Sequence, residues 1–146
     1  MTKKLSIAFL ILAILSIIIF AQKEAKQENI NISVVEVKEK IDNKKDVLLL
    51  DVRTPAEYKG ALGHLKGSIL IPLFELEDRL EELAKFKDRV IIAICKVGGR
   101  SKMATNILIK KGFKALNMSG GMVAYRAMEK NSEENETKAD SANVNQ

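Results

Sequence analysis

The only cysteine in the 146-residue chain ends a run of apolar residues, in the stretch "IAICKVGGRS" at residues 92–101. Gly98 and Gly99 follow it closely, and glycine permits backbone angles that are closed to other residues. A short loop of this kind can turn its N–H groups inward and bind an anion. Cys95 by itself could be a small apolar residue that closes a buried strand. The loop after it favours a second interpretation, in which Cys95 is a nucleophile.

The residues after Cys95 also predict that its thiol ionises readily. Lys96 and Arg100 carry positive charges, and a helix that starts near Ser101 directs its positive end toward the same place. A thiol in such a field has a lowered pKa and is largely thiolate at neutral pH. For Lys96 the alternative is a solvated charge on a flexible side chain. A single cysteine excludes an intramolecular disulfide, a CxxC redox pair and a cysteine-rich zinc site.

The elements that must position this loop follow from hydrophobic patterning. Continuous apolar runs predict strands buried on both faces of a parallel sheet, and leucines that share one face of 73–86 predict an amphipathic helix. Strands are expected at 46–52, 68–72, 89–95 and 114–118, and helices at 33–41, from 54, and at 73–86, 101–112 and 120–130. This alternation predicts an α/β domain with a mostly parallel sheet. Ligands of such sheets bind beyond the carboxyl ends of the strands, where Asp51 and Cys95 fall.

Two short patterns predict where helices begin. Ser33 with Glu36, and Thr54 with Glu57, each form a capping box, in which the two residues satisfy free N–H groups at a helix start. Pro55 stands at the first helical position, which proline favours. The first two helices should therefore begin directly after Ser33 and Thr54.

The two ends of the chain differ from the predicted domain at 31–130. Residues 1–21 combine Lys3 and Lys4 with an apolar run over 5–21, which is typical of a secretory signal peptide. An uncleaved membrane anchor is the alternative, although 17 helical residues rise about 25 Å, slightly less than a hydrocarbon core. Either way we expect the protein to be exported, to the periplasm or another extracytoplasmic place. Residues 22–30 are predicted to be a linker, and the polar residues 131–146 a disordered tail.

The charge of the chain narrows the class of ligand. The formal net charge is +5, but the lysines are spread along the sequence and aromatic residues make up only 5%. A nucleic-acid site would normally show basic residues gathered on one face or along one helix. We therefore expect small anions as partners, and no nucleic acid.

Four motifs in order carry a resemblance to a known family. They are "LLLDVRTPAEY" at 48–58, "GHLKGSILIP" at 63–72, "CKVGGRS" at 95–101 and "SGGMVAY" at 119–125. With them the chain resembles the rhodanese-like sulfurtransferases over roughly residues 31–130. The resemblance implies an α/β fold with a mostly parallel five-stranded sheet flanked by helices. It also implies that Cys95 carries sulfur as a persulfide, and that an active-site loop holds this sulfur, made of Lys96, Val97, Gly98, Gly99, Arg100 and Ser101.

The resemblance further implies a reaction in two steps. The thiolate of Cys95 would attack the outer sulfur of thiosulfate, whose charged oxygens lie near Lys96 and Arg100, and sulfite would leave. Cyanide or a thiol would then take the sulfur, which is covalent catalysis without a metal or other cofactor. Asp51, Arg53, Glu57 and His64 match framework positions of the family. We expect them to support the site, with Arg53 paired to Glu57 unless Glu57 serves only as the capping acid.

Three alternatives stand beside this prediction. His64, the only histidine, could form a thiol-protease dyad with Cys95, although a structural role fits the family better. The protein could be a persulfide carrier or partner-binding module that turns over little thiosulfate. It could also be a cysteine phosphatase or arsenate reductase. Those enzymes have five residues between cysteine and arginine, whereas this loop has four, so the loop length favours sulfur.

Overall fold

The computed structural model describes residue 14 and residues 29–143. Residues 1–21, predicted as a signal peptide or anchor, lie outside the described residues apart from residue 14, as does most of the predicted linker. Within the described part of the chain, no helix has both the length and the apolar character needed to cross a membrane.

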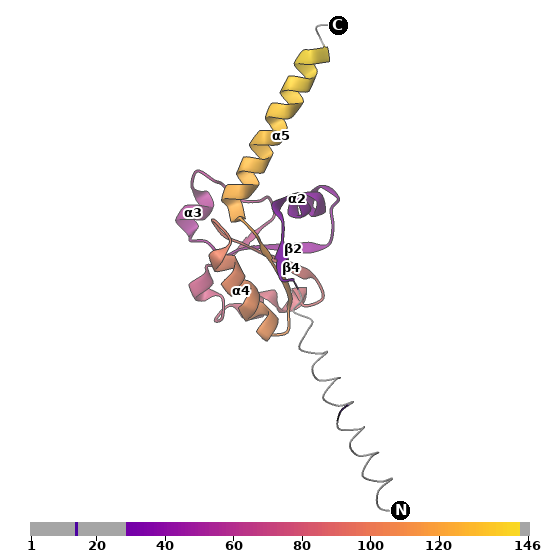
Figure 1. The fold of residues 1–146 in the computed structure, drawn as a ribbon. Coiled ribbons are helices and arrows are strands. Elements are labelled where there is room, and N and C mark those ends of the chain that lie inside the picture. Colours follow the sequence, from indigo (N-terminus) through magenta and orange to yellow (C-terminus); the bar gives the residue numbers. More distant parts are fainter. Residues whose placement is uncertain (1–13, 15–28, 144–146) are drawn as a thin grey trace, which may run out of the picture.

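The core of the fold is one sheet of five parallel strands, in the order β1-β5-β4-β2-β3 (Figure 1). The strands are β1 (Asn31–Ile32), β2 (Val47–Asp51), β3 (Ile69–Leu70), β4 (Val90–Ile94) and β5 (Lys114–Met118). The predicted α/β class and mostly parallel five-stranded sheet are confirmed. β1 was not predicted, because two residues are too few to show a period.

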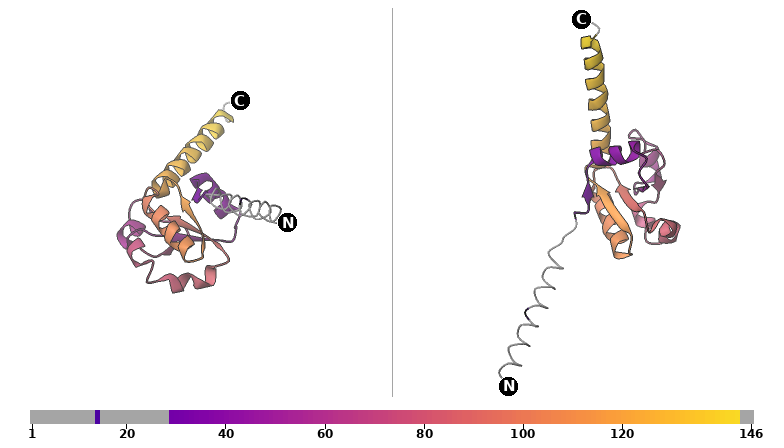
Figure 2. Two further views of the ribbon diagram at one scale, coloured as in Figure 1. Left: turned by 60° about the horizontal axis from the view of Figure 1, so that its bottom comes forward. Right: turned by 90° about the vertical axis from the view of Figure 1, so that its right-hand side faces the viewer.

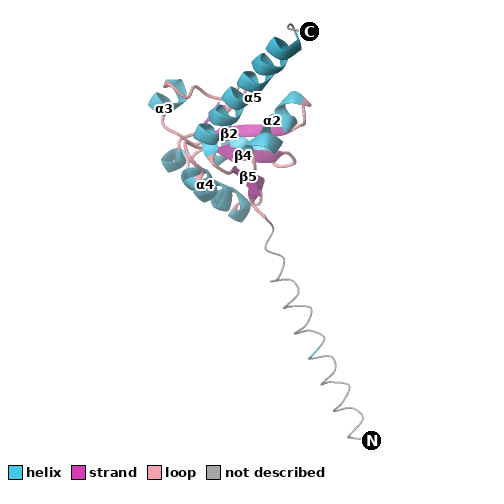
Figure 3. Ribbon diagram, turned by 45° about the horizontal axis from the view of Figure 1, so that its top comes forward, coloured by secondary structure: helices cyan, strands magenta, loops and turns pink. Residues whose placement is uncertain are grey.

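Alternate side chains of the strands enter two cores, one on each face of the sheet. Leu50 and Ala93 face a core that α4 (Gly99–Lys110) covers, whereas Leu49 and Ile92 face a core that α2 (Val34–Asp42) and α5 (Gly121–Asn143) cover. Figure 3 shows α2 and α5 on the opposite side of the sheet from α4. Since both faces are covered, the central strands have to be apolar throughout, as the sequence indicated.

The helix starts follow the sequence closely where a side chain caps them. Ser33 and Thr54 each accept from the N–H three residues later, and both capping boxes form, ahead of α2 and α3 (Pro55–Lys59). α4 differs from its prediction, because it begins at Gly99 and not at Ser101. No side chain caps α4; the left-handed backbone of Gly98 starts it.

The amphipathic α-helix predicted at 73–86 is wrong. The segment forms two 3₁₀ helices, η1 (Leu73–Glu75) and η2 (Leu80–Phe86). Its buried and half-buried leucines stand three apart, at 73 and 76 and again at 80 and 83. A 3₁₀ helix has three residues per turn, so this spacing places each pair on one side of a tighter helix, against the sheet.

The disordered tail predicted from residue 131 is helical up to Asn143, where α5 ends. Figures 1 and 2 show α5 continuing straight out of the domain. Lys130 and Glu134 form an ion pair at 3.8 Å, and the Ser132 hydroxyl donates to the Met128 carbonyl. The side chains at 131–135, 137 and 138 are exposed. The glutamate, lysine and alanine residues of the segment have high helix propensity, and they extend a helix whose first turns pack on the core.

Candidate active site

The predicted nucleophile lies at the carboxyl end of the central strand β4. Cys95 follows Ile94 directly, and only three residues separate it from the first residue of α4. Gly98 makes this short connection with a φ of +102°, and a Cβ there would come within 3.2 Å of the Gly120 nitrogen. Since L side chains rarely adopt this backbone angle, the loop needs glycine at position 98.

Hydrogen-bond donors surround the sulfur of Cys95. The Gly98 N–H donates to Sγ at 3.1 Å, and Ser101 Oγ lies 3.2 Å from it. Burial raises the pKa of the Cys95 thiol. The Ser101 hydroxyl and the N–H groups of Ser101, Gly98 and Val97 oppose this effect, and the net result is a pKa below the ordinary value of 9.0. The cradle therefore stabilises a negative sulfur although only 1% of Cys95 is exposed.

The first turn of α5 holds the loop from behind. The N–H groups of Met122 and Val123 donate to the carbonyls of Cys95 and Lys96, at 2.9 and 3.1 Å. These bonds satisfy both carbonyls and tie the loop to α5. A Cβ on Gly121 would collide with the Cys95 and Lys96 carbonyls, so the second glycine of the "SGG" motif permits this close approach. The motif, whose role the sequence did not indicate, buttresses the cradle.

Arg100 forms an ion pair with Glu57. Its guanidinium donates two hydrogen bonds to the Glu57 carboxylate, at 2.7 and 2.6 Å. Chiefly because of these bonds, the pKa of Glu57 is lowered to about 2. Glu57 also completes the capping box of α3. The charge of Arg100 is thus largely balanced, and Lys96 is the exposed cation of the loop.

The predicted ion pair between Arg53 and Glu57 is wrong. Arg53 pairs with Asp51, its NH2 group 2.7 Å from Oδ2, and donates to the backbone carbonyls of Glu57 and Gly63. Both charged side chains are buried, at 1% and 0% exposure. A buried charge needs a partner and further hydrogen bonds, which Asp51 at the strand end and the carbonyls supply. The pair fastens the segment around Gly63 to the end of β2.

His64 contacts Tyr58 rather than the sulfur. The two rings stack with centroids 3.9 Å apart, and His64 Nδ1 lies 3.2 Å from the Tyr58 carbonyl. The Tyr58 hydroxyl in turn donates to the Ser68 carbonyl at 2.9 Å. These contacts describe a structural residue and give no support to a dyad with Cys95.

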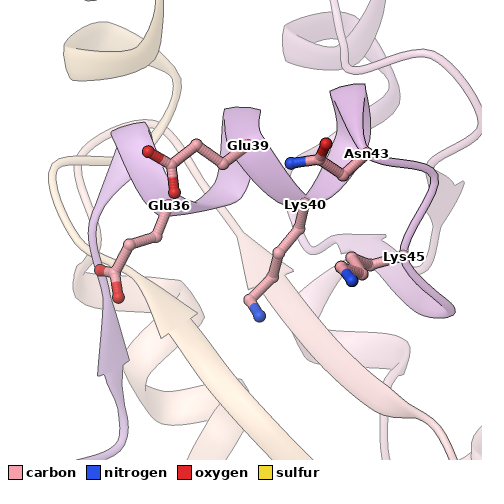
Figure 4. Close-up of a pocket in the computed structure, with 5 residues that line it drawn as sticks. All are labelled: Glu36, Glu39, Lys40, Asn43 and Lys45. Carbon is pink, nitrogen blue, oxygen red and sulfur yellow. The ribbon is translucent and has the colours of Figure 1, made fainter.

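Two pockets of about 200 Å³ differ in their relation to the loop. One adjoins the loop and is lined by Arg53, Glu57, Gly60, Ala61, Leu62 and Lys96. The other, shown in Figure 4, lies on α2 and the turn after it and is lined by Glu36, Glu39, Lys40, Asn43 and Lys45. Glu36 in that second pocket is already engaged with Ser33 as the capping acid. The first pocket is therefore the candidate site for a substrate.

Sequence reasoning missed Asn117, a residue of β5 that contacts Ser101. Asn117 is 4% exposed, and its Oδ1 lies 2.6 Å from Ser101 Oγ. A signal for it did exist. An asparagine in a strand predicted as buried must find a hydrogen-bond partner, and this one faces the same core as Cys95.

A family model described as "Rhodanese-like domain" matches residues 33–128. This chain belongs to the rhodanese-like domain family. A crystal structure of a rhodanese-like domain protein from Staphylococcus aureus is 33% identical, with a TM-score of 0.59, and the match covers 65% of this chain and 89% of that one.

Among curated proteins, a sulfurtransferase of Allochromatium vinosum is 34% identical over 60% of this chain and 78% of its own length. The thiosulfate sulfurtransferase GlpE of Pseudoalteromonas translucida is 33% identical over 66% and 89%. The putative sulfur carrier protein YrkF of Bacillus subtilis is 41% identical over 62% of this chain, which spans about half of that relative. These rhodanese-like relatives support sulfur transfer as the general activity.

Proposed function

We propose that this rhodanese-like protein is a thiosulfate sulfurtransferase in which Cys95 carries the sulfur. The observation that carries the proposal is the ring of donors around Sγ, with the Gly98 N–H at 3.1 Å and the Ser101 hydroxyl at 3.2 Å. Such donors stabilise the thiolate that attacks, and they can equally hold the negative terminal sulfur of a persulfide.

The reaction divides into two displacements. The Cys95 thiolate attacks the outer sulfur of thiosulfate, a new S–S bond forms, and the old S–S bond breaks as sulfite leaves with its electron pair. The outer sulfur of the persulfide then bonds to the carbon of cyanide or to a thiolate. The cysteine S–S bond breaks, and Cys95 regains its thiolate. The N–H groups of Gly98 and Val97 belong to the loop backbone, so they can face the sulfur during both steps without moving.

Two features support a small dianion as the donor. Lys96 stands next to Cys95, is exposed, and lines the pocket beside the loop. The GlpE relative carries the name of a thiosulfate sulfurtransferase. Arg100 contributes less free charge than its place in the loop indicated, because Glu57 binds it at two points. We therefore assign the charged oxygens of thiosulfate to Lys96.

Turnover with thiosulfate and cyanide tests the proposal, with thiocyanate as the measured product. Wild-type protein and Cys95→Ser are compared, and the intact mass of each is recorded after thiosulfate alone. We expect thiocyanate from the wild type, a wild-type species heavier by one sulfur, and neither from Cys95→Ser. If the wild type yields neither product nor persulfide, thiosulfate transfer is refuted.

A sulfur carrier is the second candidate, and similarity to the putative sulfur carrier protein YrkF favours it. A carrier would accept sulfur on Cys95 and pass it to a protein partner. The same experiment separates the two functions, because a carrier forms the heavier species but releases little thiocyanate.

We further propose that the protein works outside the cytoplasm. Lys3 and Lys4 followed by the apolar run 5–21 support export, whether this run is cleaved or retained as an anchor. Cell fractionation with an N-terminal sequence of the recovered protein tests this proposal. Recovery from the cytoplasmic fraction with residues 1–21 intact would contradict it.

A further inference from the structure

The Ser101 hydroxyl has more acceptors than it can serve. Its Oγ lies 3.2 Å from Cys95 Sγ, 3.1 Å from the Gly98 carbonyl and 2.6 Å from Asn117 Oδ1. A hydroxyl carries one proton and can donate one strong hydrogen bond. Ser101 is fully buried, so solvent water cannot replace any of these three partners. The shortest contact is with Asn117, and the sulfur competes with it.

Neighbouring amides fix which end of Asn117 faces Ser101. Asn117 and Asn31 stand opposite each other on the parallel strands β5 and β1. The Asn117 Nδ2 group donates to Asn31 Oδ1 at 2.8 Å, and Asn31 Nδ2 donates to Asn29 Oδ1 at 3.3 Å. This order of donors leaves Asn117 Oδ1 pointed at Ser101. An acceptor therefore faces the serine, and it attracts the proton that the sulfur needs.

We propose that Asn117 is a positioning residue that competes with Cys95 Sγ for the one proton of Ser101 and thereby restrains ionisation of the thiol. While the sulfur is a thiol, its S–H can donate to Ser101 Oγ, and Ser101 can donate to Asn117. When the sulfur becomes negative, Ser101 must turn toward it, and the buried Asn117 Oδ1 loses its donor. An orphaned buried acceptor is costly.

The hydrogen-bond relay from Asn117 through Ser101 to Cys95 thus balances two demands on the cysteine, reactivity and resistance to oxidation. A lower pKa gives more thiolate, but a free thiolate is also the form that oxidants attack. The extension of this relay to a persulfide on Cys95 rests on the proposed function. In that state the terminal sulfur of the persulfide would compete for the same Ser101 proton. The ionisation of the thiol does not depend on that function.

Charged groups around Cys95 are the same in every variant considered below. Its own loop carries Lys96, and α4 carries Arg100, whose charge Glu57 of α3 balances. β2 contributes Asp51, which is paired with Arg53. β5 contributes the neutral Asn117. Replacing Asn117 by another neutral residue therefore changes the hydrogen bonds without changing the charge near the sulfur.

The test is the pKa of Cys95 in the full chain, measured from the pH dependence of iodoacetamide alkylation and of thiolate absorbance. Asn117→Leu keeps a similar volume and removes the competing acceptor. We expect the pKa of Cys95 to fall by about one pH unit, which gives roughly tenfold more thiolate below that pKa. An unchanged or raised pKa in a folded Asn117→Leu protein would overturn the proposal.

A double-mutant cycle shows whether the effect passes through the serine. Ser101→Ala removes the shared proton and is expected to raise the pKa of Cys95. In that background Asn117→Leu should no longer shift it, since nothing is left to compete for. Equal shifts with and without Ser101 would refute a relay through the hydroxyl.

Thr105→Val is the matched control. Thr105 lies one turn after Ser101 on α4, is buried, and its hydroxyl has no hydrogen-bond partner among the described residues. Its replacement removes a buried hydroxyl from the same helix, and we expect the Cys95 pKa to remain unchanged. A shift as large as that of Asn117→Leu would mean that any change in this core moves the thiol, and would overturn the specific role of Asn117.

If Asn117→Leu does not fold, Asn31→Ala tests the same relay from the exposed edge of the sheet. It removes the acceptor of Asn117 Nδ2 and frees the amide to turn its donor toward Ser101. The Cys95 pKa should then fall, by less than in Asn117→Leu; no change would contradict the relay. Because alkylation needs no sulfur donor, failure of the relay is distinguishable from failure of thiosulfate transfer.

Discussion

At the scale of single residues, the site depends on charges that are paired with one another. Glu57 has two structural roles, since its carboxylate caps the start of α3 and forms an ion pair with Arg100. The pKa of Glu57 is lowered from 4.5 to about 2, mainly by the hydrogen bonds from Arg100. Its ionised form therefore stabilises the native state above pH 4.5, and this contribution is lost as the pH falls toward 2.

We predict that Glu57→Gln lowers the free energy of unfolding at pH 7 by about 1 to 2 kcal/mol, less than the full linkage value because solvent reaches the pair. The difference from the wild type should shrink between about pH 4.5 and 2. Urea unfolding at several pH values measures it. Glu81→Gln, which alters an exposed acid of η2, is the control and should show a much smaller effect. A difference that stays constant over this pH range would contradict the prediction.

At the scale of elements, the loop after β4 is held between two helix starts. The loop contributes the N–H groups of Val97 and Gly98, and the first turn of α4 that of Ser101, to the sulfur. The first turn of α5 contributes N–H groups that bind the carbonyls of Cys95 and Lys96. The backbone of the loop is therefore satisfied on both sides, which accounts for a cradle built from so few side chains. Gly121 is the residue that lets the second helix approach.

We predict that Gly121→Ala destabilises the protein by about 2 kcal/mol or more and lowers sulfur transfer at least tenfold, since the added Cβ collides with the Cys95 carbonyl. Gly112→Ala is the matched control. Gly112 also has a positive φ, at +82°, but an added Cβ there meets nothing within 4 Å. The Gly112→Ala protein should be destabilised only because alanine disfavours this positive φ, and it should keep its activity. Equal loss of activity in both variants would contradict the claim that the close approach at Gly121 supports the Cys95 loop.

At the scale of the whole molecule, the folded domain ends before the helix does. The side chains of α5 that enter the core, Met122 and Tyr125, belong to its first turns, and residues 131–135 are exposed. Figures 1 and 2 show the later turns leaving the domain. The described side chains beyond residue 130 therefore add little to the stability of the sheet and its two cores.

We predict that a chain ending at Lys130 keeps its free energy of unfolding within about 0.5 kcal/mol and keeps full activity, because the removed side chains that the structure describes, at 131–135, 137 and 138, are exposed. Thermal unfolding and thiocyanate formation measure both. A chain ending at Ala124 is the contrasting variant. It loses the buried Tyr125 and should unfold at a much lower temperature. Marked destabilisation of the first truncation would show that the extension does pack on the domain.

The sequence by itself determined the features that depend on neighbouring residues. The capping boxes of Ser33 and Thr54 and the apolar strands β2 and β4 come from contacts or patterns within a few residues, so they can be recognised without a fold. The loop after Cys95 was recognisable for the same reason. The 3₁₀ helices at 73–86 were missed because spacings of three and of 3.6 differ little over so short a segment.

Only the tertiary structure decided which distant groups meet around the loop that holds the sulfur. Arg100 and Glu57 are 43 residues apart in the sequence, and Asn117 and Asn31 are 86 apart. The strand order places β5 between β1 and β4, and this adjacency alone brings the asparagines together beside Ser101. A polar side chain shows by its type that it needs a partner, but the packing of the sheet selects the partner.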